Sequence, residues 1–285
     1  MRGILNSNKQ KLSERRKTIL TKFDFQPQKF DYLIRRGQKN GDGGYLIPKN
    51  VNADLLISFG LGDNWKFENE LVKVGQVKSF IVFDYTQNLI NYLKQVASRL
   101  KLQNFNLNLL AGRTIVTCRY FKDFIFLQKK HVKRKISRNG YGLLGQLKSY
   151  EINIPEIFER YVYPKNQTIL LKVDIEGSEY EIIEQIMSFS NQIILIVIEF
   201  HGIINKADEF KKLLDLIKSE YSLIHTHINN NGKISENNIP DICEFTFYSK
   251  KEFDGSLKVN KIPLSKLDQP NSKKRVDFQI DFNAN

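Results

Sequence analysis

The stretch Leu170–Ile183 reads LLKVDIEGSEYEII, and it indicates the fold class more specifically than any other part of the chain. The apolar run Thr168–Val173 (TILLKV) is typical of a buried β-strand, which we expect to end at Asp174. The next helix is expected at Glu179–Phe189. A buried strand that passes directly into a helix is the repeating unit of a parallel α/β sheet.

Short apolar runs alternate with longer amphipathic segments on both sides of this stretch. We expect further strands at Asp54–Phe59, Ser79–Phe83, Leu107–Leu110, Ile115–Tyr120, Gln192–Phe200, Tyr221–Ile228 and Ile242–Tyr248. Helices are expected at Trp65–Val74, Leu89–Leu102, Pro155–Tyr161 and Asp208–Glu220. This order predicts an α/β fold with a Rossmann-like, doubly wound and mostly parallel sheet that closes with an antiparallel terminal strand pair.

The composition is that of an ordinary globular protein. Of 285 residues, 41% are hydrophobic, which argues against a disordered chain. We expect a basic, helical or irregular N-terminal leader at residues 1–40 and one domain at residues 41–285. Cys118 and Cys243 show neither metal-ligand spacing nor a disulfide pattern. The longest apolar run, Ile193–Phe200, is too short to cross a bilayer, so we expect a cytoplasmic protein.

Positive charge is in excess. The 44 Lys and Arg residues outnumber 31 Asp and Glu residues, which gives a net charge of +13 and favours contact with polyanions. The basic clusters lack the interleaved aromatic side chains that stack on bases. We therefore interpret the basic clusters as solvated tails and loops rather than as a surface that binds nucleic acid. The basic, Gly-rich residues 128–145 predict a long loop, and acceptor contacts are expected there and after Gly202 and Ile228.

A glycine turn follows the first predicted strand. Gly60 and Gly62 stand in FGLGD (Phe59–Asp63), where two glycines allow the backbone to turn closely against a ligand. Asp84 follows the next predicted strand, where a carboxylate would accept hydrogen bonds from both ribose hydroxyls of a nucleotide. A dinucleotide motif would have a third glycine where this chain has Trp65. A nucleoside ligand without phosphates, such as S-adenosylmethionine, therefore fits this pattern better than NAD. The alternative interpretation of the two glycines is an ordinary tight turn that binds no ligand.

Acidic side chains and a histidine follow two later strands. Asp174 and Glu176 come after one strand, and Glu199 and His201 stand at the end of the next. Carboxylates are costly to bury unpaired, so we expect them to face a solvated cleft, a cation, or the ammonium and sulfonium of the ligand. The alternative is a helix N-terminus, whose dipole accounts for Glu179 but not for Asp174.

Several motifs carry a resemblance to a known family. KVDIEGSEYEII (Lys172–Ile183) resembles the hallmark of FkbM-type methyltransferases, a K-hydrophobic-D-hydrophobic-E-G-x-E run that closes the fourth strand. Similar elements, covering roughly residues 40 to 280, are DGGY (Asp42–Tyr45), SFGLG (Ser58–Gly62), IEFHG (Ile198–Gly202), His225–Asn231 and LDQPN (Leu267–Asn271). Many members have an acidic residue where this chain has Ser58, and Asp63 is the candidate to replace it.

The resemblance implies an S-adenosylmethionine-dependent methyltransferase, most often one that O-methylates a sugar hydroxyl on a glycan, glycolipid or secondary metabolite. The implied partner is a small-molecule or glycan acceptor. The residues expected to bind the cofactor are Gly60, Gly62, Asp63, Asp84 and Asp174.

Methyl transfer to a hydroxyl gains from a general base, because a hydroxyl is a poor nucleophile at neutral pH. His201 is the first candidate, since an imidazole titrates near neutrality. Asp174 and Glu176 are the alternatives and would hold the acceptor or the base.

A metal site is a further possibility. His225 and His227 alternate along one predicted strand and therefore face the same side. With Asp174, Glu199 and His201 they could bind a divalent metal that acidifies the acceptor. We favour a polar, hydrogen-bonded face without a metal.

Two other classes of function remain as alternatives. A nucleic-acid-binding protein would use the net positive charge and be indifferent to Asp84 and Asp174. A metal-dependent hydrolase would lose its activity on chelation and have no use for S-adenosylmethionine. Carboxylates at successive strand ends favour the methyltransferase, because a site for polyanions would not be lined with acids.

Overall fold

The computed structural model describes residues 16–19, 24–28, 30, 32–61, 64–83, 154–162, 166–252 and 267–280. The predicted helix at 89–102, the predicted strands at 107–110 and 115–120 and the basic segment 128–145 lie outside the described residues. Three residues of the predicted cofactor site, Gly62, Asp63 and Asp84, also lie outside them.

The main sheet has six strands in the described part of the chain, in the order β5-β4-β6-β7-β9-β8. The bounds are β4 Ala53–Phe59, β5 Val77–Phe83, β6 Ile169–Val173, β7 Ile193–His201, β8 Tyr221–Ile228 and β9 Ile242–Ser249. Strands β5, β4, β6 and β7 are parallel, whereas β9 is antiparallel to both β7 and β8. The prediction of a mostly parallel sheet with an antiparallel terminal pair is confirmed.

The strand order changes direction between β4 and β6. From β4 the chain goes to β5 on one side, and β6 lies on the other side of β4. Open α/β sheets bind ligands at such a switch point, beyond the carboxyl ends of the strands. The topology therefore directs attention to the residues that follow Phe59 and Val173.

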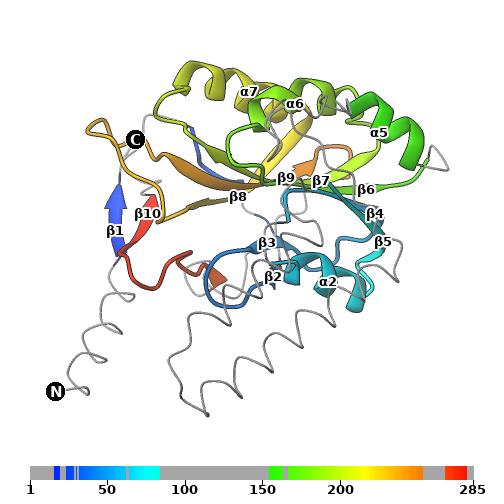
Figure 1. The fold of residues 1–285 in the computed structure, drawn as a ribbon, viewed down its shortest axis with the longest axis horizontal. Coiled ribbons are helices and arrows are strands. Elements are labelled where there is room, and N and C mark those ends of the chain that lie inside the picture. Colours follow the sequence, from blue (N-terminus) through cyan, green and yellow to red (C-terminus); the bar gives the residue numbers. More distant parts are fainter. Residues whose placement is uncertain are drawn as a thin grey trace, which may run out of the picture.

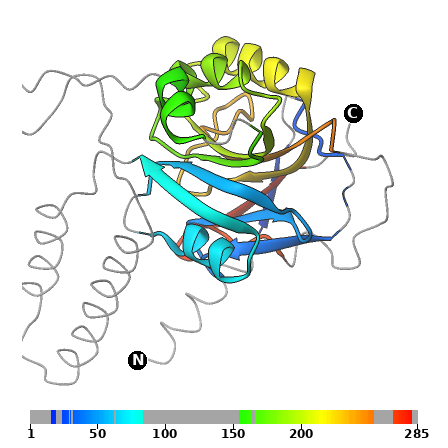
Figure 2. The same cartoon turned by 90° about the vertical axis from the view of Figure 1, so that its right-hand side faces the viewer.

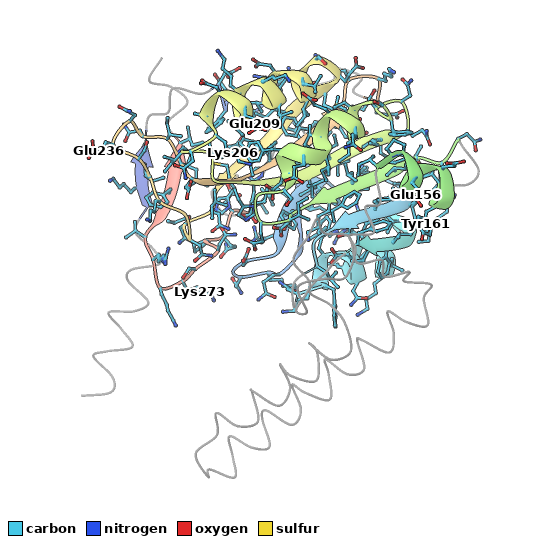
Figure 3. All side chains as sticks on the ribbon, turned by 45° about the horizontal axis from the view of Figure 1, so that its top comes forward. Glu156, Tyr161, Lys206, Glu209, Glu236 and Lys273 are labelled. Atoms are coloured by element: carbon cyan, nitrogen blue, oxygen red, sulfur yellow. The ribbon has the colours of Figure 1, made fainter. Side chains whose placement is uncertain are left out.

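Helices cover both faces of the sheet (Figures 1 and 2). On one face lie α5 (Ile154–Tyr161), α6 (Glu179–Met187) and α7 (Ala207–Glu220), and on the other lies α2 (Lys66–Lys73). Lys206 and Glu209 mark the beginning of α7 in Figure 3. This arrangement is the doubly wound architecture that the sequence predicts.

The two faces differ in polarity. Strand residues beneath α5, α6 and α7 are buried and apolar, as in Ile57, Leu171 and Phe245, and continuous burial of this kind produces the apolar runs seen in the sequence. The face toward α2 is apolar near the strand starts but polar near the strand ends. The polar residues there are Ser58, Lys172, Glu199, Glu244 and His227, all buried, with Ser58 opposite Lys172 and Glu244 between Glu199 and His227.

A hairpin of β2 (Leu33–Gly37) and β3 (Gly44–Pro48) packs on the same side as α2 (Figure 1). Thr246 of β9 donates a hydrogen bond of 2.7 Å to the carbonyl of Leu46. Arg36 forms an ion pair of 3.1 Å with Glu70 of α2. These contacts hold the hairpin against the main sheet and against α2.

Part of the predicted leader is strand rather than helix or coil. Residues 33–37 form β2, and β1 (Arg16–Ile19) pairs in parallel with β10 (Asp277–Ile280) near the C-terminus. The partner of β1 lies at the other end of the chain, so the local pattern contained no signal for it. The division at residue 40 stays a prediction.

The other predicted elements within the described residues form with bounds that differ by no more than two residues from those expected. No helix in these ranges is long and apolar enough to cross a membrane.

Candidate active site

The glycine turn after β4 touches the segment after β6. Gly60 has a φ of 80°, and a Cβ at this position would lie 1.6 Å from the carbonyl oxygen of Asp174. The Gly60 N–H donates to Phe83 O, and the Asp174 N–H donates to Phe59 O, both at 2.9 Å. The ends of β4, β5 and β6 therefore meet here, and the meeting point requires glycine at position 60.

A buried lysine lies beside this junction. Lys172 is 3% exposed, and its Nζ donates to the carbonyl of Gly60 at 2.6 Å. Carboxylate oxygens of Glu68 and Asp174 each lie 3.7 Å from Nζ. A buried ammonium requires such pairing, so Lys172 links the glycine turn to Asp174.

A buried carboxylate of α2 lies beside Ser58 at the end of β4. Ser58 donates its hydroxyl to Oε1 of Glu68 at 2.8 Å, and Glu68 is fully buried. Asp63, the residue predicted to replace the acid that many family members have in place of Ser58, lies outside the described residues.

Tyr45 of the DGGY element lies beside the end of β6. Its hydroxyl donates to Oδ2 of Asp174 at 3.0 Å. Burial raises the pKa of Tyr45 well above its usual value, and the charges of Asp174 and Glu199 raise it further. Tyr45 thus remains a hydrogen-bond donor that orients the Asp174 carboxylate.

Three more carboxylates gather next to Tyr45. Oxygens of Asp42, Glu199 and Glu244 lie within 4.8 Å of one another. Asn229 donates to Glu199 at 2.5 Å, and Asn271 donates to Glu244 at 2.6 Å and to Asp42 at 3.0 Å. The hydrogen bond from Asn271 to Asp42 therefore joins the LDQPN element to the DGGY element.

Electrostatic repulsion affects the protonation of this group. Burial, then the negative charges of Asp174 and Glu244, raise the pKa of Glu199 well above its ordinary value, while the hydrogen bond from Asn229 opposes the change. Burial and the neighbouring carboxylates therefore favour the protonated form of Glu199.

His201, the last residue of β7, is surrounded by glutamates. Its Nδ1 lies 2.9 Å from Oε1 of Glu179, and its Nε2 lies 3.5 Å from Glu176 and 3.8 Å from Glu199. Burial lowers the pKa of His201, but the hydrogen bond and charge of Glu179, with the charges of Asp174 and Glu176, outweigh it and raise the pKa overall.

The turn after β6 presents Glu176 outward. Glu176 has a φ of 56° and the next residue, Gly177, a φ of 102°, which are left-handed conformations that tighten the turn. The Glu176 side chain is 77% exposed, whereas that of His201 is 13% exposed. One ligand atom each of Asp174, Glu176 and His201 lies within 4.8 Å of the others. The three residues predicted to be catalytic are therefore neighbours.

The predicted metal set is divided between two places. His225 Nε2 lies 2.8 Å from Asp268, and His227 lies 3.3 Å from Glu244 and 3.7 Å from Asp277. Each histidine thus pairs with carboxylates other than those that pair with His201, although Glu244, the partner of His227, is the cross-strand neighbour of Glu199. These pairings are those of a hydrogen-bonded polar face, and we assign no metal to them.

Among the residues at this site that were not predicted from the sequence are Tyr45, Glu68, Lys172, Glu179 and Glu244. A charged residue inside an otherwise apolar strand, such as Lys172 in TILLKV or Glu244 in ICEFTFYS, is a usable signal, because burial of a charge requires a partner. Glu179 was ascribed to a helix N-terminus, and it lies there but also turns inward to His201.

Taken together, the strand ends combine a tight glycine turn, carboxylates and an imidazole. Carboxylates attract a cationic ligand, and an imidazole beside them accepts a proton. The arrangement is suited to holding a positively charged nucleoside and to deprotonating an acceptor.

The comparison with known protein families finds a methyltransferase domain. Residues 146–226 match the sequence model of the methyltransferase FkbM domain, which confirms the family resemblance over that stretch. No curated protein matches.

Among solved structures, Streptococcus pneumoniae Sp1610 in complex with S-adenosyl-L-methionine is similar at 12% identity, over 76% of this chain and 72% of that chain, with a TM-score of 0.34. M. capricolum TrmK in complex with S-adenosyl-homocysteine has 10% identity over 80% and 73%, with a TM-score of 0.31. The precorrin-6y C5,15-methyltransferase of Geobacter metallireducens has 10% identity over 71% and 83%, with a TM-score of 0.32. TM-scores this low carry no argument about the activity of this chain.

Proposed function

We propose that this protein is an S-adenosylmethionine-dependent methyltransferase that O-methylates a sugar hydroxyl on a glycan, glycolipid or secondary metabolite. One observation carries most of the weight: the glycine turn at Gly60 contacts Asp174 at the switch point of the sheet. The FkbM domain match includes Asp174, Glu199 and His201.

The residues present suit this cofactor. Asp174 offers a carboxylate beside the glycine turn, which favours the ammonium and sulfonium charges of S-adenosylmethionine. Glycine at position 60 lets the turn lie directly against the backbone of Asp174 and so places that residue beside the turn. Gly62, Asp63 and Asp84 complete the proposed set on the evidence of the sequence.

When bound, the cofactor supplies a methyl group that its sulfonium has already activated. The protein then needs to align the acceptor with that methyl group and exclude water. In this proposal His201 removes the hydroxyl proton, and Asp174 and Glu176 hold the acceptor or the base. The acidic surroundings raise the pKa of His201, so the imidazole becomes a more effective base once it is neutral.

Isothermal titration calorimetry with S-adenosylmethionine tests cofactor binding. We expect binding by the wild type and none by Asp84→Ala, because the ribose contact is lost. Asp215→Ala, which removes an exposed carboxylate of the same type on α7, is the matched control and should bind like the wild type. Absence of binding by the wild type would contradict the proposal.

The acceptor class is tested with radiolabelled S-adenosylmethionine and fractionated cell glycans, lipids and RNA. Label in the glycan or glycolipid fraction supports sugar O-methylation, whereas label confined to RNA contradicts it. A chelator should leave the transfer unchanged. Loss of activity on chelation would favour the metal-dependent alternative.

A further inference from the structure

Glu179 occupies an unusual position for a residue in the first turn of a helix. It is fully buried, and its Oε1 accepts hydrogen bonds from the backbone N–H groups of Ile175 and Gly177, both at 3.1 Å. The same oxygen lies 2.9 Å from Nδ1 of His201. One carboxylate oxygen therefore organises the turn after β6 and contacts the proposed base.

This contact determines which nitrogen of His201 is free to act. A carboxylate that accepts backbone N–H groups has no proton to give, so Nδ1 must donate to it. The neutral imidazole then carries its lone pair on Nε2. Nε2 lies on the side of Glu176 and Glu199 rather than of the helix.

Glu179 also favours a positive charge on His201. Oε2 of Glu179 is buried without a hydrogen-bond partner, and His201 is the one cationic side chain that pairs with Glu179 within the described residues. A buried carboxylate with so little compensation stabilises a positive charge on its neighbour. The proton taken up at Nε2 is stabilised through the ring by Glu179.

We propose that Glu179 is a positioning residue for methyl transfer, which holds His201 in the Nδ1–H tautomer and stabilises the imidazolium that forms when Nε2 takes a proton from the acceptor. This role rests on the proposed function of His201 as general base. Glu179 itself touches neither cofactor nor acceptor in this scheme. The acceptor hydroxyl loses its proton to Nε2, and its oxygen receives the methyl group as the carbon–sulfur bond breaks.

Three carboxylates raise the pKa of His201: Glu179 from α6, and Asp174 and Glu176 from the turn after β6. Glu199 of β7 also faces the ring, with its Oε2 3.8 Å from Nε2. A test must therefore separate Glu179 from its neighbours, which substitution of that residue alone achieves.

The tautomer is measured first, on the wild type, without any acceptor. Two-bond ¹H–¹⁵N correlation spectra of the full ¹⁵N-labelled chain distinguish the Nδ1–H from the Nε2–H form. The chain has four histidines, and the signals absent from His201→Gln identify His201. We expect Nδ1–H for the neutral ring, and Nε2–H would overturn the proposal whether or not the protein transfers methyl groups.

The effect of charge is then measured with Glu179→Gln. The glutamine oxygen can still accept from Nδ1 and from both backbone N–H groups, so the tautomer should persist while the pKa of His201 falls. Glu181→Gln removes an exposed charge from the same helical turn and is the matched control, with no change in the pKa of His201 expected. Equal pKa values for wild type and Glu179→Gln would contradict the proposal.

The pH dependence of methyl transfer gives the functional readout. A base must be neutral, so the acidic limb of kcat/KM should move to lower pH in Glu179→Gln, and the plateau should fall about tenfold or more because the base is weaker. A merely structural role would lower the rate without moving the limb, and this outcome would overturn the proposal. If the wild type binds no S-adenosylmethionine but shows the Nδ1–H tautomer, the proposed function fails while the Glu179–His201 pairing stands.

Discussion

Replacement of Gly60 by alanine tests whether the contact between the ends of β4 and β6 is what the site depends on. The added Cβ would lie 1.6 Å from the Asp174 carbonyl oxygen, about 1.4 Å short of the 3.0 Å that real contacts reach. This neighbouring atom belongs to the backbone, which cannot rotate away as a side chain could. The two strand ends must therefore separate or the turn must change its conformation.

The cost can be worked out from three contributions. A left-handed conformation costs alanine about 1 kcal/mol. Separation of the strand ends strains the hydrogen bonds from Gly60 to Phe83 and from Asp174 to Phe59, each of which contributes about 1 kcal/mol. We expect Gly60→Ala to lower the free energy of unfolding by about 3 kcal/mol and to weaken binding of S-adenosylmethionine.

Gly75 provides a matched control for the backbone conformation. Its φ of 73° is close to the 80° of Gly60, but nothing lies within 4 Å of a Cβ at that position. Gly75→Ala should therefore cost only about 1 kcal/mol and leave cofactor binding unchanged. Urea denaturation and calorimetry measure both quantities. Equal losses of stability in the two variants would refute the idea that the Gly60–Asp174 contact requires glycine.

Two further predictions concern buried charges. Lys172→Met leaves Glu68 buried without its cation and should lower the free energy of unfolding, measured by urea denaturation, by about 3–5 kcal/mol. The double variant with Glu68→Gln should recover more than half of this loss of stability. No recovery would show that the stability does not depend on the Lys172–Glu68 pair. For His227, burial lowers the pKa, but the carboxylates of Asp277 and Glu244 outweigh it and raise the pKa to about 10. A histidine whose pKa is higher in the folded than in the unfolded protein stabilises the fold fully only below its unfolded pKa, near 6.5, and this stabilisation is lost as the pH rises through the folded pKa, about 10. The free energy of unfolding should therefore fall between pH 7 and 10 by on the order of 3 kcal/mol. His227→Gln should flatten that decline, and an unchanged slope would contradict the assignment.

Much of the sheet could be predicted because burial imposes a local pattern. Strands covered on both faces appear as uninterrupted apolar runs, and β8 forms over the predicted residues, Tyr221–Ile228. The strands β1, β2, β3 and β10 were not predicted. Each of these strands is short. Because β1 pairs with a segment at the opposite end of the chain, no local periodicity in the sequence predicts this pairing.

The candidate site was predicted in part for the same reason. Asp174, Glu199 and His201 directly follow or end apolar runs, so sequence position alone indicated that they lie at strand ends. The contribution of the hairpin was not predicted in this way. Tyr45 reaches Asp174 across a separation of 129 residues, and the DGGY element was recognised only through its family resemblance.

What the sequence by itself determined is the six strands of the main sheet and the helices that cover it within the described residues, the order of polar residues at the strand ends and the family of the central motif, because these depend on patterns a few residues long. Only the tertiary structure decided which charges meet: that Glu179 turns to His201, that Lys172 pairs with Glu68, and that His225 and His227 have carboxylates of their own. The physical reason is that such pairs depend on strand order, register and the approach of the β2–β3 hairpin. These features bring together residues that are far apart in the chain, and buried charges are stable only where a partner is within reach.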